Sequence, residues 1–273
     1  MNRLLVSAAH KSSGKTMVCI GLAAALRARG ETVQPFKKGP DYIDPLWLGL
    51  AAGRPCYNLD PYVTGEREIR AELARRMQGA SIGIVEGNKG LHDGMDLEGS
   101  NSNAAVAAML GAPVVLVVDA RGMTRGVAPL VLGFQAFDPR VRIAGVILNR
   151  VGGARHEAKL RAAIERYTPI PVLGAVHEDE SLAIAERHLG LVPSNEAEGA
   201  RARVDEIGAR IAGQVDLDAL VAVARSAGPL ASMPPADAAP RPAPGARVRV
   251  AIARDSAFGF YYPGDLEALR EAG

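Results

Sequence analysis

The stretch 7–16, which reads SAAHKSSGKT, constrains the fold of this chain more than any other part of the sequence. It follows the short apolar run Arg3–Ala8 and opens a stretch with helical periodicity, 15–29. This strand–loop–helix setting is typical of a phosphate-binding loop, because backbone N–H groups of the loop and the helix N-terminus point at phosphate oxygens. The motif departs from G-x-x-x-x-G-K-[ST] at its first glycine, which is Ala9 here. The sequence therefore predicts a nucleotide-binding unit.

Two side chains of this loop carry specific chemistry. Lys15 would neutralise charge on the β- and γ-phosphates, and the Thr16 hydroxyl would ligate Mg²⁺. We expect Lys15 to lie on the solvent side of the fold rather than in the core. The expected cofactors are ATP and Mg²⁺. The nucleotide-binding candidates in the loop are Ser12, Ser13, Gly14, Lys15 and Thr16.

Short apolar runs alternate with helical patterns over most of the chain, and several runs lack polar alternation, which is typical of strands buried on both faces. The predicted strands are Arg3–Ala8, 32–36, Ile82–Glu86, Val114–Asp119, 143–148 and 172–176. The predicted helices are 15–29, 66–77, Asn103–Leu110, Val127–Phe137 and Ala154–Tyr167. A short strand at 190–192 and helices at 196–211 and 216–225 close the unit. This order predicts an α/β, P-loop NTPase-like fold, with a mostly parallel sheet and helices on both faces.

The composition changes abruptly after this unit. Residues 229–246 are rich in proline and alanine and have no apolar period, so they predict an extended linker. The pattern then restarts with a predicted strand at 247–253 and a predicted helix at Pro263–Ala272. We therefore expect one domain over 1–228, a linker over 229–246, and the opening of an incomplete second domain over 247–273.

Charge and cysteine content narrow the classes of function. Lys and Arg number 32 and Asp and Glu number 30, a formal net charge of +2, whereas a general polyanion binder needs an excess of clustered cations. Two cysteines are too few for a disulfide scaffold or a four-cysteine zinc site. The apolar run at the start is too short to span a membrane or to act as a signal peptide. We expect a cytoplasmic protein that binds neither nucleic acid nor membrane.

Two further blocks carry carboxylates where a strand ends. Residues 36–45, FKKGPDYIDP, follow the second predicted strand, and such a loop faces the ligand crevice of an open α/β sheet. This block could place Asp41 near the metal and Asp44 near a substrate, or it could be a proline-bounded turn with solvated charges. In residues 86–94, EGNKGLHDG, Glu86 ends a strand, where a second Mg²⁺-associated carboxylate of a P-loop enzyme would stand. Asp93 follows on a glycine-rich loop.

Together, the phosphate-binding loop, FKKGPDYIDP, the triplet Asn58-Leu59-Asp60 and EGNKGLHDG resemble the cobyrinic acid a,c-diamide synthase family in their order and spacing. That family shares a superfamily with dethiobiotin synthetase and the partition-type ATPases, which implies a dethiobiotin-synthetase-like fold. The resemblance covers residues 4–192. The linker and the restarting strand are similar to the family's junction with its glutamine amidotransferase domain.

The resemblance implies a two-part reaction on the a- and c-acetate carboxylates of cobyrinic acid or a related tetrapyrrole. ATP phosphorylates the carboxylate, and ammonia then displaces phosphate from the acyl phosphate to give an amide. In the family the ammonia comes from glutamine, which a second domain hydrolyses. A carboxylate is a poor acyl donor until its oxygen becomes a leaving group, and phosphoryl transfer needs mainly cation clamps and alignment. We also expect a homodimer.

The resemblance assigns site residues by motif position. Asn149, at the end of a predicted strand, would read adenine. The implied metal ligands are Thr16, Asp41 and Glu86. The residues that would position substrate carboxylates and intermediates are Asp41, Tyr42, Asp44, Glu86 and Asp93.

Two other readings stay open. Where the family usually has an apolar pair, this chain has Asn88 and Lys89, and its AHKSSGKT and EGNKGLHDG blocks are also similar to a subgroup that amidates siroheme. Lys89 could meet a more acidic substrate. The alternative of another class is a dimerising partition-type switch ATPase that binds DNA or membrane, a function that would leave DYIDP and Asp93 without a role.

Overall fold

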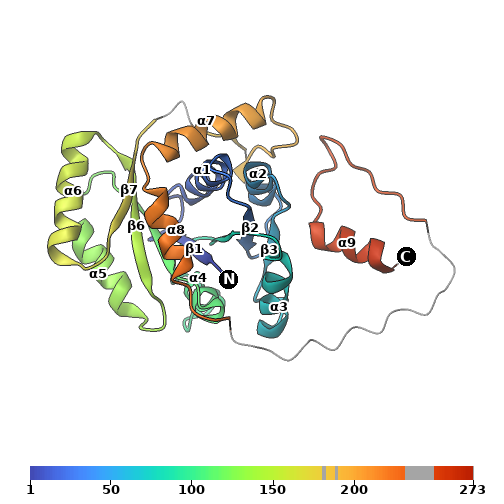
Figure 1. Cartoon of the computed structure of the whole chain (residues 1–273), viewed down its shortest axis with the longest axis horizontal. Helices are drawn as coiled ribbons and strands as arrows, with labels where there is room; N and C mark the ends of the chain where they lie inside the picture. The colour runs from blue at the N-terminus through green and yellow to red at the C-terminus, as the bar shows by residue number, and fades with distance from the viewer. Residues whose placement is uncertain (180–182, 188–189, 231–248, 273) are drawn as a thin grey trace.

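Seven parallel strands form one sheet in the order β3-β2-β4-β1-β5-β6-β7 (Figure 1). The structure is a computed structural model, and it describes residues 1–179, 183–187, 190–230 and 249–272. The strands are β1 (Arg3–Ala8), β2 (Val33–Lys38), β3 (Tyr57–Leu59), β4 (Ile82–Glu86), β5 (Val114–Asp119), β6 (Ile143–Val151) and β7 (Val172–His177). The all-parallel sheet confirms the predicted fold class.

Helices cover both faces of this sheet, as the sequence predicts. One face packs against α1 (Lys15–Ala28), α2 (Ile43–Ala52), α7 (Ala200–Ala212) and α8 (Leu217–Arg225). The other face packs against α3 (Glu66–Arg76), α4 (Asn103–Leu110), α5 (Val127–Phe137) and α6 (Ala154–Tyr167). In β1, Leu4 and Val6 point into the first layer and Leu5 into the second, because side chains alternate along a strand. The strand order places β1 in the interior of the sheet, between β4 and β5.

Two elements of the structure lie in a stretch without a predicted element. Helix α2 begins within the DYIDP block, at Ile43, and carries Pro45 in its first turn, where a missing N–H costs no helical hydrogen bond. Strand β3 has only three residues and pairs with β2 at the edge of the sheet. A helix with proline at its start and a three-residue strand have weak periodicity, so no sequence pattern predicts either element.

Three predictions near the end of the chain need correction or restriction. Residues 249–253 form no strand, which contradicts the predicted strand at 247–253; no described segment pairs with them, and a strand needs the backbone of a neighbour. The helix predicted at 196–211 is α7, which begins only after Gly199, at φ 68°. The strand predicted at 190–192 is β9 (Gly190–Leu191), which pairs antiparallel with β8 (Glu186–Arg187), outside the main sheet.

Most of the predicted linker, 231–246, lies outside the described residues. The helix predicted after it is α9 (Pro263–Ala272), which lies beyond the edge strand β3 and outside the two helix layers (Figure 1). Among the described residues, no helix combines the length and the hydropathy that crossing a bilayer requires.

Candidate active site

The loop 9–14 connects β1 with α1, at the carboxyl edge of the sheet where the strand order reverses. Gly14 precedes α1 in a left-handed conformation, at φ 83°, and a Cβ there would lie 2.2 Å from Asn149 Nδ2. No side chain caps the first turn of α1, so its N–H groups remain available to an anion. The predicted strand–loop–helix unit is therefore present, with its glycine required by geometry.

Lys15 is buried, with 8% of its surface exposed, so the expectation that it lies on the solvent side was wrong. Burial lowers its pKa, and the charge of Glu86 partly opposes this. Within the described part of the chain, the Lys15 ammonium forms no ion pair with a carboxylate. A buried, unpaired cation at the start of a helix gains much by meeting a polyanion.

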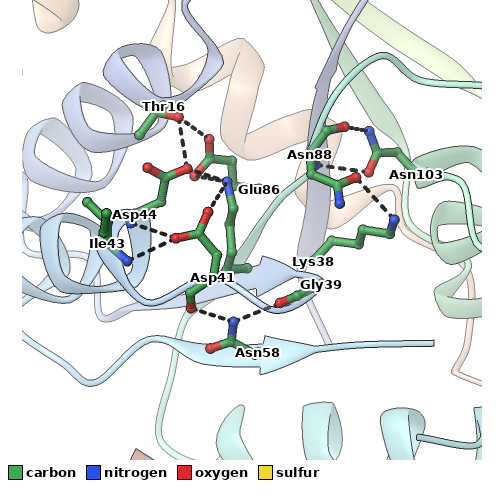
Figure 2. Close-up of polar contacts among 11 residues, drawn as sticks. Thr16, Lys38, Gly39, Asp41, Ile43, Asp44, Asn58, Glu86, Asn88 and Asn103 are labelled. Carbon is green, nitrogen blue, oxygen red and sulfur yellow. Dashed lines mark hydrogen bonds and ion pairs between the residues drawn. The ribbon is translucent and has the colours of Figure 1, made fainter. Parts of the chain in front are cut away.

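Thr16, Asp44 and Glu86 come together from three separate segments (Figure 2). The two carboxylates of this cluster also pair with Lys37. The Thr16 hydroxyl donates to Glu86 Oε1 at 2.6 Å and lies 3.2 Å from Asp44 Oδ2. Lys37 Nζ lies 2.5 Å from Asp44 Oδ2, 3.3 Å from Glu86 Oε2 and 3.9 Å from Asp41 Oδ2. No role was predicted for Lys37, the cation that pairs with the carboxylates of this cluster.

The charges of this cluster depend on one another. Burial raises the pKa of Glu86 to about 7, and Lys37 opposes that rise. Burial alone would lower the pKa of Lys37, but the charges of Glu86, Asp44 and Asp41 outweigh burial and hold it above its ordinary value. The lysine therefore stays charged and compensates carboxylates that would otherwise be costly to bury.

Asp41 has a structural task that the sequence did not reveal. Its Oδ1 accepts the backbone N–H groups of Ile43 at 2.9 Å and Asp44 at 3.0 Å, so it caps the first turn of α2 (Figure 2). Asn58 Nδ2 donates to the carbonyls of Gly39 at 2.8 Å and Asp41 at 2.9 Å, which fixes the same loop. These contacts explain how α2 starts with Asp44 facing Thr16.

The loop after β4 is organised by Asn103, a residue that the sequence analysis missed. Its Oδ1 accepts the Asn88 N–H at 3.1 Å, and its Nδ2 donates to the Asn88 carbonyl (Figure 2). The same Nδ2 lies 2.9 Å from the Gly90 carbonyl oxygen, to which it also donates. Lys38 Nζ donates to Asn88 Oδ1 at 3.1 Å. Asp93 is exposed, and its Oδ2 accepts the Gly90 N–H at 2.9 Å. A buried neutral asparagine at the start of a helix carries no sequence signal for this role.

The cluster fits a hard divalent cation, which prefers hydroxyl and carboxylate oxygens such as those of Thr16, Asp44 and Glu86. Glu86 Oε2 is buried and accepts no hydrogen bond. Among the described residues, no three His, Cys, Asp or Glu side chains form a ready metal cage. Mg²⁺ usually needs only one or two protein carboxylates, together with water and substrate phosphates. These residues therefore suit a Mg²⁺ ion that arrives with a nucleotide.

The end of β6 holds the phosphate-binding loop from one side. Asn149 Nδ2 donates to the Ser13 carbonyl at 2.9 Å, and Arg150 Nη1 donates to the Ser12 carbonyl at 2.8 Å. Ser12 and Arg150 both have left-handed backbones, at φ 63° and 56°, which is costly for residues with a Cβ. Arg150 Nη1 also lies 2.7 Å from Asp119 Oδ2. Two strained residues are thus tied to each other and to the end of β5.

Asp119 should make the stability of the fold depend on acid pH. Burial would raise its pKa, but hydrogen bonds from Arg121 and Arg150 outweigh burial and lower it to about 2. An ordinary unfolded aspartate has a pKa of about 3.9, so the ionised form favours folding. The stabilisation is complete above about pH 5 and is lost as the pH falls toward 2. We expect the Asp119→Asn variant to melt a few degrees below the parent at pH 7, with a gap that narrows below about pH 4. An equal gap in melting temperature at pH 7 and pH 3 would contradict this assignment.

A family profile described as "CobQ/CobB/MinD/ParA nucleotide binding domain" matches residues 5–192. A cobyrinate a,c-diamide synthase of Magnetococcus marinus is 54% identical over 274 residues, which are 99% of this chain and 59% of that protein. A hydrogenobyrinate a,c-diamide synthase of Thermobifida fusca is 48% identical over 283 residues, 99% of this chain and 60% of that protein. The chain therefore spans about three fifths of the length of these curated relatives.

One similar solved structure is more distant in sequence than these relatives. The cell division ATPase MinD of Pyrococcus furiosus is 18% identical, with a TM-score of 0.45, over 77% of this chain and 98% of that one.

Proposed function

The chain belongs to the CobQ/CobB/MinD/ParA nucleotide-binding domain family, and on that premise we propose that it uses ATP to convert the a- and c-acetate carboxylates of cobyrinic acid into amides. The names of the relatives support cobyrinic acid as the acceptor, because these names describe enzymes that act on cobyrinate or hydrogenobyrinate. The observation that carries the proposal is the cluster of Thr16, Lys37, Asp44 and Glu86 at the carboxyl edge of the sheet. The buried Lys15 precedes Thr16 at the start of α1, and the neighbouring loop bears Asp41 and Tyr42.

In the proposed reaction, a carboxylate oxygen of the acceptor attacks the γ-phosphorus of ATP, and the bond to the ADP oxygen breaks. Ammonia then attacks the acyl carbon, phosphate leaves with its bonding electrons, and the nitrogen loses a proton. Both steps need alignment and charge compensation more than covalent participation by the protein. The free N–H groups of α1 and the buried Lys15 ammonium meet the phosphates. Bound Mg²⁺ would offset charge on the phosphate oxygens.

The contacts favour an exchange of two roles that the sequence analysis assigned. Asp44, not Asp41, lies 3.2 Å from the Thr16 hydroxyl, so Thr16, Asp44 and Glu86 are the ligands that we propose for Mg²⁺. Asp41 keeps one oxygen on the α2 backbone and turns the other toward Lys37. We propose that Asp41, Tyr42 and Asp93 lie on the acceptor side. Asn149 as the reader of adenine stays a prediction, as do the homodimer, the glutamine-derived ammonia and the cytoplasmic location.

The acceptor can be identified by supplying the candidate acceptors in parallel reactions. The purified chain is incubated with Mg²⁺, ATP and an ammonium salt, and with cobyrinic acid, siroheme, duplex DNA or anionic lipid vesicles in parallel. We expect ATP turnover to rise with cobyrinic acid, and mass spectrometry to find two amides on the product. Amides on siroheme alone would support the siroheme alternative. A rise with DNA or vesicles, and none with either macrocycle, would support the switch ATPase.

The Arg150→Ala variant tests whether the phosphate-binding loop needs its contact with Arg150 to bind ATP. We expect Arg150→Ala to raise the KM for ATP about tenfold with a smaller change in kcat, since it releases a strained Ser12 without removing a phosphate contact. Arg121→Ala is the matched control, because Arg121 also pairs with Asp119 and has no contact with Ser12. Equal effects of the two substitutions on KM would show that the contact with Ser12 does not matter.

A further inference from the structure

The segment 249–272 packs beside the proposed acceptor loop. The ring of Tyr42 stacks on Tyr262, with centroids 4.2 Å apart and planes inclined by 19°. It also stacks on Phe260 at 5.6 Å and 14°. Farther along, Tyr57 of β3 donates to Glu267 of α9 at 2.7 Å, and Arg76 pairs with the same carboxylate. Residues near the end of the chain thus touch a residue that the sequence analysis assigned to the substrate.

A cavity of about 260 Å³ lies between this segment and α2. Its walls are mostly apolar and aromatic, with contributions from Tyr42, Leu46, Tyr261, Tyr262 and Leu266. Asp41 lines the cavity as well, so the cavity borders the residue that faces Lys37. The cavity therefore adjoins the proposed site.

Two arginines line the cavity without a partner. Arg254 and Arg270 are both exposed, and neither makes an ion pair or a side-chain hydrogen bond with any residue that the structure describes. The acidic residue of α9 at this cavity, Glu267, is already held by Tyr57 and Arg76. The side of the cavity that residues 249–272 form therefore carries uncompensated positive charge. Such a surface suits an anion that also has an apolar body.

We propose that 249–272 forms the second wall of the acceptor site, with Arg254 and Arg270 binding peripheral carboxylates of the macrocycle; this inference rests on the proposed function. An apolar ring system that carries carboxylates offers a face to the tyrosines and anions to the arginines. Drug-sized ligands fill about 300–1,000 Å³, so this cavity takes one edge of a macrocycle and not the whole ring. That edge would lie opposite the carboxylate that reacts near Asp41.

Binding can be followed with the single tryptophan of the chain. Trp47 is buried in α2, the helix that lines the cavity, and a coloured macrocycle bound there should quench its emission. The test variant is Arg254→Gln with Arg270→Gln. The control is Arg249→Gln, an exposed arginine of the same segment that does not line the cavity. The ligands are cobyrinic acid and its fully methylated ester, which keeps the ring and removes the carboxylates.

We expect the double variant to bind cobyrinic acid about tenfold or more weakly, because two charge-assisted contacts are lost. Its affinity for the ester and its KM for ATP should match those of the parent, since neither arginine contacts the phosphate-binding loop. The control should bind both ligands as the parent does. A double variant that prefers the acid to the ester as strongly as the parent overturns the inference. A parent that binds neither ligand overturns the proposed function, and this inference with it.

Discussion

The Lys15→Ala variant should lose ATP hydrolysis by a factor of about 100 to 1,000, the cost of removing one preorganised charge-stabilising group from a transition state. Lys15 opens α1, is almost completely buried, and forms no ion pair with a described carboxylate. Its burial is a standing cost that a triphosphate would offset. The melting temperature should therefore change little, because the variant removes an uncompensated buried charge rather than a bonded one.

Lys11 provides a matched control for this substitution. It lies in the same loop and is exposed, so Lys11→Ala should leave ATP turnover within about twofold of the parent. The measurement is steady-state ATP hydrolysis, with thermal unfolding of each variant beside it. Normal ATP turnover in a folded Lys15→Ala protein would contradict the assignment of the nucleotide site.

Lys37→Met should lower the free energy of unfolding by about 3–5 kcal/mol, the usual cost of removing one partner from a buried ion pair. The lysine faces Asp44, Glu86 and Asp41 within 4 Å, and the Glu86 side chain has no solvent exposure. Without Lys37, the carboxylates of Glu86 and Asp44 repel each other in a medium that solvates them poorly. The loss should be largest at about pH 8, where Glu86 is ionised, and smaller at pH 6, where it can take up a proton.

Lys38→Met is the control, because Lys38 is buried too but its ammonium donates to the neutral Asn88 side chain. Urea unfolding of both variants gives the comparison, and the double variant Lys37→Met/Glu86→Gln should recover part of the loss. If Lys37→Met unfolds at the same urea concentration as Lys38→Met at both pH values, the stability of the cluster does not depend on the charge of Lys37.

The local sequence pattern was enough to predict the first strand and the first helix of the chain. The strand Arg3–Ala8 is as predicted, and the helix after the loop differs from its prediction by one residue at its end. Both elements are mostly buried apolar stretches, and the motif in the loop between them marks where the strand ends and the helix begins. Over its described part, residues 249–253, the strand predicted at 247–253 is absent for the opposite reason, because local β propensity cannot form a strand without a neighbour.

The candidate site could be predicted as a set of residues but not as a set of contacts. Asp41 and Asp44 are three residues apart, and the sequence could not show which one faces Thr16. That choice depends on α2, an unpredicted helix whose first turn Asp41 caps. Asn103 and Arg150 act on loops far from them along the chain, through an amide and a strained backbone, and neither feature leaves a recognisable sequence pattern.

We propose that this chain activates a carboxylate with ATP and transfers the acyl group to ammonia. The most direct measurement supplies the parent chain with Mg²⁺, ATP, ¹⁵N-ammonium and cobyrinic acid labelled with ¹⁸O in its carboxylates. Mass spectrometry of the product and of the released phosphate then follows both atoms. The proposed mechanism predicts one ¹⁵N in each new amide and one ¹⁸O in the phosphate released for each amide formed. Amides that form while the phosphate stays unlabelled would contradict the acyl-phosphate route, and ATP consumption without any labelled amide would contradict the proposed function.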